Sequence, residues 1–579
     1  MRSLSPSWHR VSTIPPVSLT VSLPLLAALL AGGCGGGGGG GGGSGSGGAT
    51  ASTASVGVTG LTVGGTVTGL HSGTTLVLQN NGANNLTIGA DGPFTFTKPA
   101  NQGSKYAVTL LTSPSGEKCS IASASGVLAT TDVTNIAVVC LANVWTWIGG
   151  SNLVDAAGKY GALNVDAAAD IPGARAGAIA WTGTPAKLWL FGGAGYDASG
   201  QSGSLNDLWT YCNCSGPFIW TWVGGSSSAN ASGSYGVRGT AAAANIPGAR
   251  QQGSSWADTY GNLWLFGGDG FDTAGTSGAL NDLWKYTPSQ ALWAWIGGSS
   301  SVGASGVYGT RGTAAVGNVP GSRQDGRSWS DAAGNLWLFG GAGADSVAAV
   351  GELNDLWRFS TTDGTWTWVQ GSNLANAAGT YGTEGTGAAG NSPGARTGAV
   401  SWTDASGTFW LFGGQGYGSV GAPGSLADLW SFSPTSGLWT WIAGPTTANA
   451  VGVYGQEGVA AAANLPGGRT NANSWIDAAG NLWLFGGVGF DSAGVSGPLN
   501  DLWEYNVAAD NWTWIAGSNH ADVLGIYGTV GQVAVTSVPG ARSSTYNWLD
   551  ASGNLWLFGG LGNAQTGAGS LNDLWEYTP

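Results

Sequence analysis

The residues of this chain that could do chemistry are polar side chains that interrupt a repeated pattern. Six segments of similar sequence continue past a P-G-A-R-like motif, and polar residues there replace the Gly, Ser, Ile or Val of other copies. These residues are Gln252, Asp325, Arg327, Asn471, Asn473 and Tyr546. Their carboxylate, guanidinium, amide and phenol groups suit the binding of a polar ligand. Asp325 and Arg327 lie two residues apart on one strand face, so they could line a polar pocket or merely pair with each other.

A second variable position lies in a loop, three residues after a Tyr-Gly pair found in every copy. Its residues are Leu163, Arg238, Arg311, Glu384, Glu457 and Val530. Two successive copies have arginine and the next two have glutamate, so we expect a directional charge pattern that contributes to binding. The alternative is that these are solvated loop charges without consequence.

No catalytic residue and no metal site are predicted. The repeated motifs contain no nucleophile paired with a general base, and beyond residue 33 the only histidines are His71 and His520. Aspartates that follow a repeated double glycine could bind calcium, although no single loop has enough carboxylates. These aspartates are Asp197, Asp272, Asp345 and Asp491. We therefore expect no cofactor, with calcium as the open alternative.

The elements that must position these residues follow from a fixed period. The double glycine starts at Gly192, Gly267, Gly340, Gly413, Gly486 and Gly559, a spacing of 73 to 75 residues. Each unit contains four short β-rich runs separated by Gly, Asn, Asp and Pro. In the third unit they are Arg323–Trp329, Asn335–Gly341, Leu353–Phe359 and Trp366–Val369. Four strands per repeated unit are typical of one blade of a β-propeller.

The repeat resembles the kelch motif. Paired glycines follow an apolar strand, an aromatic residue comes 16–18 residues later, and a W-T-W strand follows. The resemblance implies an all-β fold in which residues 142–579 form a six-bladed kelch-type propeller, like the central domain of galactose oxidase. The first W-T-W, Trp145–Trp147, precedes any P-G-A-R, and the chain stops at Pro579 without a final W-T-W. We therefore expect the N-terminal strand to complete the last blade, which leaves no free sheet edge.

Residues present in every copy are predicted to serve packing. Thirty of the 31 tryptophans recur at five places per unit, and Arg175 and Asp207 recur in all copies as well. Because charged residues are only 8% of the chain, we expect these Arg and Asp side chains to be buried, hydrogen-bonded partners. The Tyr-Gly tyrosines are expected to fold their own loops, with sugar stacking as the alternative.

The N-terminal region resembles a bacterial lipoprotein. Residues 1–33 have basic Arg2 and Arg10, an apolar stretch and small residues before Cys34, so they are predicted to be a signal peptide. Cys34 would then carry the lipid, and Gly35, rather than Asp, implies sorting to the outer membrane. A plain secreted protein is the alternative. Residues 34–54 are a Gly-rich linker, and residues 55–141 are predicted to form a β-sandwich that resembles immunoglobulin-like or transthyretin-like modules.

The remaining cysteines are predicted to be oxidised. Cys119 and Cys140 are expected to form a disulfide, as befits an exported protein. Cys212 and Cys214 are expected to be an oxidised pair within one loop, because a metal site would need further ligands.

These observations predict a non-enzymatic binding module for a glycan or protein at the cell surface. The long loops between successive blades and between the second and third strands of each blade emerge on one face, where ligands are expected. The formal charge of −13 and the lack of a basic stripe exclude nucleic acid as a partner, and only a lipid anchor would contact the membrane. Kelch-like propellers also include copper radical oxidases, which need histidines, and a sialic-acid epimerase. An enzyme of the latter kind and a purely structural envelope protein are the alternatives.

Overall fold

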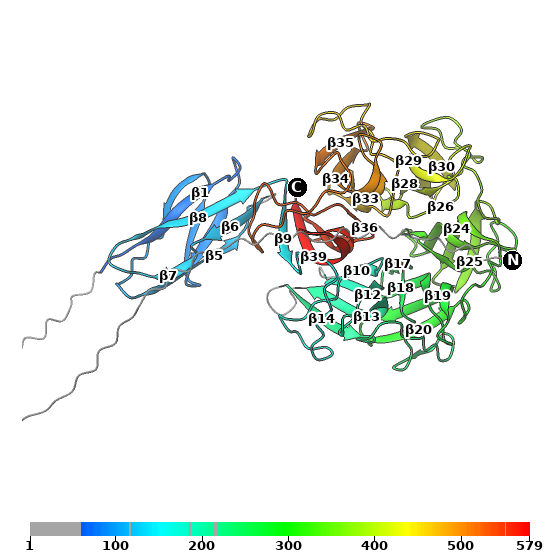
Figure 1. Cartoon of the computed structure of the whole chain (residues 1–579), viewed down its shortest axis with the longest axis horizontal. Helices are drawn as coiled ribbons and strands as arrows, with labels where there is room; N and C mark the ends of the chain where they lie inside the picture. Colours follow the sequence, from blue (N-terminus) through cyan, green and yellow to red (C-terminus); the bar gives the residue numbers. More distant parts are fainter. Residues whose placement is uncertain (1–58, 115–116, 184–186, 213–217, 551) are drawn as a thin grey trace, which may run out of the picture. The chain divides into compact units, whose positions relative to one another are not determined.

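The structure is a computed structural model that describes residues 59–114, 117–183, 187–212, 218–550 and 552–579 (Figure 1). Every regular element in this part of the chain is a β-strand. The strands fall into two groups, β1–β8 and β9–β39, and the repeated sheets of the second group form a β-propeller. No helix in the described ranges has the length and hydropathy needed to cross a bilayer.

The first group contains two four-stranded sheets, ordered β4-β1-β8-β6 and β3-β2-β5-β7. Their bounds are β1 Val63–Thr68, β2 Leu76–Asn80, β3 Asn84–Ile88, β4 Gly92–Thr95, β5 Lys105–Thr112, β6 Lys118–Ala122, β7 Ser125–Val127 and β8 Val133–Leu141. Alternate residues of β1, β2, β5 and β8 are buried, and they meet in one core that includes Val67, Leu78 and Ile136. Burial of every second residue is what a strand with one face on a core requires.

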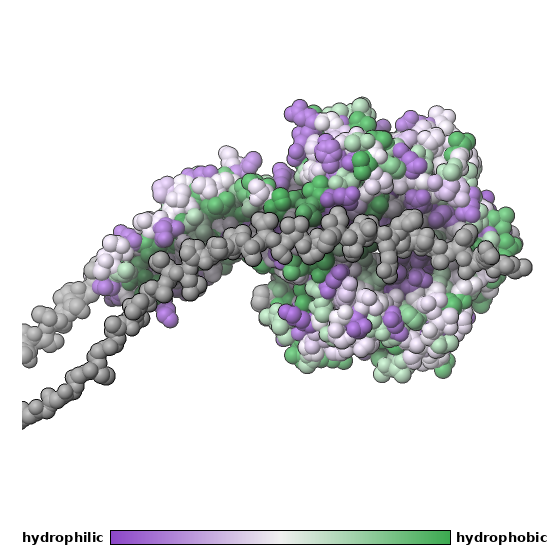
Figure 2. Space-filling model, in the orientation of Figure 1, coloured by the Kyte–Doolittle hydropathy of each residue, from purple (hydrophilic) through white to green (hydrophobic). Residues whose placement is uncertain are grey.

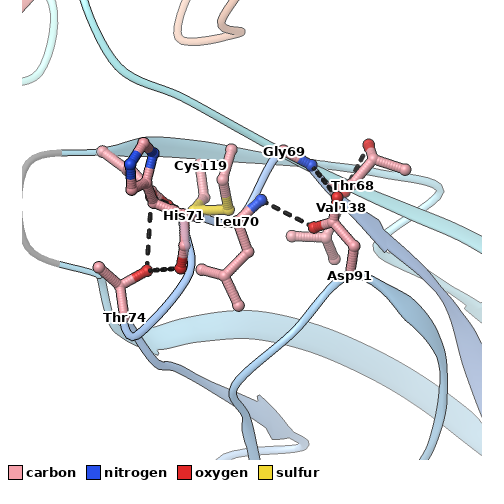
Figure 3. Close-up of a disulfide and its surroundings, with 10 residues drawn as sticks. Thr68, Gly69, Leu70, His71, Thr74, Asp91, Cys119 and Val138 are labelled. Atoms are coloured by element: carbon pink, nitrogen blue, oxygen red, sulfur yellow. Dashed lines mark hydrogen bonds between the residues drawn. A yellow bond between two sulfur atoms is a disulfide. The ribbon is translucent and has the colours of Figure 1, made fainter.

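The predicted disulfide between Cys119 and Cys140 is present (Figure 3). The two cysteines are direct partners in the antiparallel pair β6 and β8, with Cα atoms 4.0 Å apart. Beside it, the backbone N–H of His71 donates to Glu117 Oε1 at 2.6 Å, and Leu70 donates to Asp91 Oδ1 at 2.8 Å. The covalent bond therefore ties the edge strand β6 to its only neighbour within this sheet.

The second group contains six sheets, numbered here in chain order. Sheet 1 contains β10 Arg175–Ala176, β11 Ile179–Gly183, β12 Lys187–Tyr196, β13 Ser202–Cys212 and β14 Ile219–Gly224. Sheet 2 contains β15 Ala241–Ala242, β16 Arg250–Gln251, β17 Ser254–Ala257, β18 Leu263–Phe271, β19 Ser277–Thr287 and β20 Leu292–Gly297. Sheet 3 contains β21 Arg323–Gln324, β22 Arg327–Ser330, β23 Leu336–Ala344, β24 Val350–Ser360 and β25 Thr365–Gln370. Sheet 4 contains β26 Arg396–Thr397, β27 Val400–Thr403, β28 Phe409–Gly416, β29 Gly424–Ser433 and β30 Leu438–Ala443. Sheet 5 contains β31 Arg469–Thr470, β32 Asn473–Ile476, β33 Leu482–Phe490, β34 Ser496–Asn506 and β35 Asn511–Ala516. Sheet 6 contains β36 Arg542–Ser543, β37 Tyr546–Leu549, β38 Leu555–Asn563, β39 Ala568–Thr578 and β9 Val144–Gly149.

The predicted strand runs match these elements except at the innermost strand. The run predicted as Arg323–Trp329 is two strands, β21 and β22, because Asp325 between them has a left-handed backbone with φ of 54°. The break recurs in every sheet, and it positions the candidate site described below.

The sheets close into a ring, as predicted. The inner strands β11, β17, β22, β27, β32 and β37 each contact the next, and β37 contacts β11. In sheet 6 the outermost strand is β9, where Trp147 is the register partner of Trp575 in β39 (Figure 1). Both ends of the propeller therefore share one sheet.

Residues common to all copies fill the space between neighbouring sheets. Each core cluster combines tryptophans, tyrosines and leucines of two successive sheets, for example Trp337 and Trp430. The double glycine allows this close approach. A Cβ on Gly340, whose φ is 64°, would lie 2.8 Å from the backbone oxygen of Arg396 in the next sheet.

The repeated charges form buried ion pairs, as expected. In each sheet the arginine donates two hydrogen bonds of 2.6 to 2.8 Å to the aspartate carboxylate, and all twelve side chains are at most 1% exposed. The pairs are Arg175–Asp207, Arg250–Asp282, Arg323–Asp355, Arg396–Asp428, Arg469–Asp501 and Arg542–Asp573. The loop tyrosine, such as Tyr308, donates to the same carboxylate at 2.6 Å, so it secures its own loop. These groups are structural.

Candidate functional site

Six residues with a left-handed backbone surround the propeller axis, one from each inner strand. They are Gly177, Gln252, Asp325, Gly398, Asn471 and Ser544, with φ between 52° and 62°. Four of them are not glycine, so the conformation costs roughly 1–2 kcal/mol at each of those positions. Because all six copies adopt it, the ring requires this backbone whatever the side chain. We call these residues the axial ring.

A closed cycle of backbone hydrogen bonds joins the axial ring. Each N–H donates to the carbonyl oxygen of the equivalent residue in the preceding sheet, over 2.6 to 3.3 Å. The cycle runs Gly177 to Ser544, Gln252 to Gly177, Asp325 to Gln252, Gly398 to Asp325, Asn471 to Gly398 and Ser544 to Asn471. Since every N–H of the ring is used, hydrogen-bond donors for a ligand at this site must come from side chains.

Asp325 is the centre of the side-chain cluster within the axial ring. Its carboxylate accepts a hydrogen bond of 2.6 Å from Gln252 Nε2 and lies 3.3 Å from Arg327 Nη2. Burial raises the pKa of Asp325, and the Arg327 charge with hydrogen bonds from Asn471 and Gln252 only partly offsets this. Burial likewise lowers the pKa of Arg327, which the charge of Asp325 opposes. The side chains of Asp325 and Arg327 are still 13% and 25% exposed, so water or a ligand can reach them.

A carboxylate from the third strand joins this cluster. Glu352 in β24 is the register partner of Ala342, which in turn pairs with Gln324, the neighbour of Asp325. Burial, followed by the charge of Asp325, raises the pKa of Glu352 to about 7. An ionisable group that changes charge near neutral pH beside a second carboxylate is uncommon outside functional sites.

Several buried polar atoms at and beside the axial ring have no hydrogen-bond partner among the described residues. They are Arg327 Nε, Glu352 Oε2, Asn473 Nδ2, Thr397 Oγ1 and Thr545 Oγ1. The Tyr546 hydroxyl oxygen, by contrast, accepts a hydrogen bond from the backbone N–H of Ala178, and burial raises the pKa of Tyr546. A buried donor or acceptor without a partner costs about 1–3 kcal/mol, which a ligand with hydroxyl groups would recover.

Below the axial ring, inner strands are linked by side chains instead of backbone. Ser255 Oγ donates to the carbonyl of Ala180 at 3.1 Å, Ser328 Oγ to that of Ser255 at 2.9 Å, and Ser474 Oγ to that of Ser401 at 3.1 Å. These bonds hold adjacent sheets in register along the axis. The polar cluster is therefore built on rigid strands rather than on loops.

The structure brings one predicted set together and separates the other from it. Arg327, Asn473 and Tyr546 belong to the inner strands at the axis, and Gln252, Asp325 and Asn471 lie in the breaks just before those strands. Arg238, Arg311, Glu384 and Glu457 instead lie in exposed loop segments along the outermost strand of their sheets. Gly239 N–H, next to Arg238, donates to Trp295 of β20, and Gly385 N–H, next to Glu384, donates to Trp441 of β30. The inner-strand residues and the loop residues thus occupy two regions, the axis and the outer rim.

The reason is that the long loop doubles back. It leaves the outermost strand of one sheet, follows the outer edge of the next, and returns to the axis at P-G-A-R. The sequence shows the length of this loop but not its path.

Glu352 is a site residue that the sequence analysis missed. A signal for it does exist, because the equivalent residues are Ser204, Ala279, Ser425, Pro498 and Ser570. Glutamate is therefore the one ionisable residue among six copies at this position.

The aspartates considered for calcium have turn roles. Asp345 Oδ1 accepts from Val347 N–H at 2.8 Å and from Ala349 N–H at 2.9 Å, while Oδ2 accepts from Ala375 N–H at 3.0 Å. Hydrogen bonds from these amides lower the pKa of Asp345 despite its burial. Within the described ranges, the one close group of potential metal ligands is Glu117, Cys119 and Cys140, and its two sulfurs are joined in the disulfide.

Two predicted cysteine roles cannot be placed in the fold. Cys34, the expected lipidation site, and Cys214, half of the expected second pair with Cys212, lie outside the described residues. Both roles stay predictions.

Comparisons with known proteins add little to this picture. No protein-family model matches the sequence, and no curated protein matches it. Among solved structures, one described as "Structure of YjhT" aligns with a TM-score of 0.43 and 15% sequence identity, covering 70% of this chain and 95% of that one. At this level of similarity we draw no functional conclusion from it.

Proposed function

We propose that this chain is an outer-membrane lipoprotein whose six-bladed, kelch-type propeller follows a small sandwich domain and binds a glycan at its axis. The propeller acts as a non-enzymatic binding module. The observation that carries this proposal is the axial cluster around Asp325. Nearly every side chain shared by the six copies is engaged in packing, whereas polar variation gathers where the six sheets meet.

The chemistry of the cluster favours a glycan over a protein. Gln252, Asn473 and Arg327 supply hydrogen-bond donors, while Asp325 and Glu352 supply acceptors. Sugar hydroxyl groups both donate and accept, so they can satisfy such a mixed set. A protein ligand would ordinarily be held by about 20–30 residues on each side, whereas the axial cluster consists of a few polar side chains.

Attachment to the outer membrane through Cys34 is part of the proposal and rests on the signal-like residues 1–33. It can be tested by labelling the expressed protein with a fatty-acid analogue. Incorporation that disappears in Cys34→Ser supports lipidation, whereas equal labelling of both proteins excludes Cys34 as the acceptor.

Binding is tested with the purified protein on a glycan array, followed by calorimetric titration of the best ligand. We expect Gln252→Ala and Glu352→Gln to weaken binding by at least about tenfold, since each removes one hydrogen bond to a buried group. Arg238→Gln, on the outer rim, is the matched control and should leave the affinity unchanged. Equal loss for rim and axial variants, or no glycan ligand at all, would refute axial binding.

An enzyme acting on a sugar is the second candidate, because Glu352 has a pKa of about 7 and lies near Asp325. Such a group can exchange protons at neutral pH, as a carbohydrate epimerase requires. The repeat resembles the kelch motif, and kelch-like propellers include a sialic-acid epimerase, which agrees with this alternative. It predicts that a bound sugar is converted, as seen by NMR, and that Glu352→Gln abolishes conversion while retaining binding.

A further inference from the structure

Two repeat positions on the outer part of the propeller change the sign of their charge around the ring. The loop position has Leu163, Arg238, Arg311, Glu384, Glu457 and Val530, and a position in the third strand has Thr210, Lys285, Arg358, Ser431, Glu504 and Glu576. Equivalent positions in six similar sheets meet the same structural demands. Since Thr, Ser, Lys, Arg and Glu all occupy the strand position, folding does not require a charge there.

Sheets 2 and 3 carry four cations, which we call the basic rim: Arg238, Lys285, Arg311 and Arg358. Arg238 and Arg311 donate from Nε to the carbonyls of Ile296 and Val369, at 2.9 and 3.1 Å. In the part of the chain that the structure describes, none of the four has a carboxylate within 4.0 Å. Their positive charges therefore form no ion pair with a described carboxylate.

Tryptophan rings hold three of these cations in place. Arg311 lies 5.9 Å from the centroid of Trp368, Lys285 lies 5.7 Å from that of Trp264, and Arg358 lies 5.9 Å from that of Trp337. A cation over an aromatic face loses little further freedom when it meets an anion. The basic rim is thus prepared for a negatively charged partner.

Sheet 5 has glutamate at both of these positions, and sheet 4 has Glu384 at the loop position and the uncharged Ser431 at the strand position. We call Glu384, Glu457 and Glu504 the acidic rim. Glu384 and Glu457 are exposed, and Glu504 Oε1 accepts from Asn481 Nδ2 at 2.6 Å. Burial chiefly raises the pKa of Tyr577, and Glu504 and Glu457 add to it, which places both carboxylates near one residue.

Among the described residues, no Lys or Arg lies within 4.0 Å of a carboxylate of the acidic rim. From residue 359 to residue 579 the only Lys or Arg residues are Arg396, Arg469 and Arg542, each buried in its pair with aspartate. The face of the molecule in Figure 2 mixes hydrophilic and hydrophobic residues.

We propose that the basic rim of one copy of this protein binds the acidic rim of a second copy. An anionic polymer would account for the cations alone, whereas a second copy accounts for both signs at equivalent positions. The two rims are different surfaces, so the contact is heterologous and generates a ring or a chain of copies. This inference is independent of ligand binding at the axis.

The first test measures association of the purified full chain by sedimentation velocity over a range of concentrations. We expect larger species at about 0.02 M salt and a monomer at about 0.5 M, because the Debye length falls from roughly 20 Å to roughly 4 Å. A monomer at every concentration in low salt overturns the proposal. If that monomer binds an acidic polysaccharide through Arg238 and Arg311, an anionic polymer is the partner instead.

The second test exchanges the charges. The double variants Arg238→Glu/Arg311→Glu and Glu384→Arg/Glu457→Arg should each associate at least about tenfold more weakly than the unaltered chain, because like charges then meet across the contact. Mixed in equal amounts, the two variants should associate again, since each supplies the charge that the other lacks. Failure of the mixture to associate, with both variants folded by circular dichroism, contradicts the proposal.

Lys98→Glu/Lys105→Glu is the matched control. It alters the net charge by the same amount as the double arginine reversal, at exposed positions among β1–β8. We expect its association to equal that of the unaltered chain. If it also loses association, net charge rather than the rims governs self-contact, and the proposal is wrong.

Discussion

At the scale of single residues, side chains that recur in every repeat and side chains that occur in one repeat have different roles. The six arginine–aspartate pairs have hydrogen-bond partners within the fold and sit where water does not reach. Glu352 is the opposite case, because it is buried in part, has an unpartnered Oε2 and faces the charge of Asp325. Groups of this second kind reduce stability and are kept where a ligand can use them.

Glu352 therefore predicts a pH-dependent stability. Its folded pKa of about 7 lies above the ordinary value of 4.5, so the folded state holds an extra proton between these two values. The contribution of Glu352 to the free energy of unfolding is fully present below pH 4.5, and it is lost as the pH rises through about 7. Replacement by glutamine removes the ionisation, so Glu352→Gln should exceed the unaltered protein by roughly 1–3 kcal/mol at pH 8 and match it near pH 4.5.

Urea unfolding at the two pH values measures this difference. Glu384→Gln, at an exposed rim position, is the control, and it should change the free energy of unfolding equally at both pH values. A Glu352→Gln protein that is no more stable than the unaltered one at pH 8 would show that the carboxylate is not destabilised by its surroundings.

At the scale of elements, glycines set how closely two sheets approach. Gly340 and Gly385 both have positive φ, 64° and 71°. A Cβ on Gly340 would lie 2.8 and 2.9 Å from the backbone oxygens of Arg396 and Leu353, whereas one on Gly385 would meet open space. The two positions therefore separate backbone strain from steric overlap.

Alanine substitutions should reveal this separation. Gly385→Ala is expected to cost about 1 kcal/mol of unfolding free energy, from the left-handed backbone alone. Gly340→Ala should cost at least about 2–4 kcal/mol, because neighbouring backbone must also move. Denaturant titrations of both variants provide the comparison, and equal costs would mean that sheet-to-sheet approach at Gly340 is looser than described.

At the scale of the whole molecule, the pairing of β9 with β39 closes the ring. Val144 and Thr578 are register partners across this pair, although 433 residues separate them along the chain. Closure of this kind removes the free edges that an open row of sheets would expose.

Cysteines at the two partner positions test the closure. Val144→Cys/Thr578→Cys should form a disulfide on mild oxidation, seen as a mass change on intact protein and as faster migration without reductant. Val144→Cys/Glu576→Cys is out of register and should cross-link far less. Equal cross-linking of the two pairs would contradict the register described for the closing sheet.

The sequence by itself determined the period, the strand runs, the burial of the shared Arg, Asp and Trp residues, and the donation of β9 to the last sheet. These features depend on local hydrogen bonding and on packing between neighbouring copies, which every repeat restates. Only the tertiary structure decided which unrepeated residues meet. Asp325 and Asn471 come from sheets that are not neighbours, and the left-handed ring brings them together at the axis. Arg238 and Glu384 lie in loops that run along the outer edge of a sheet, and the repeat period of the sequence does not predict that course.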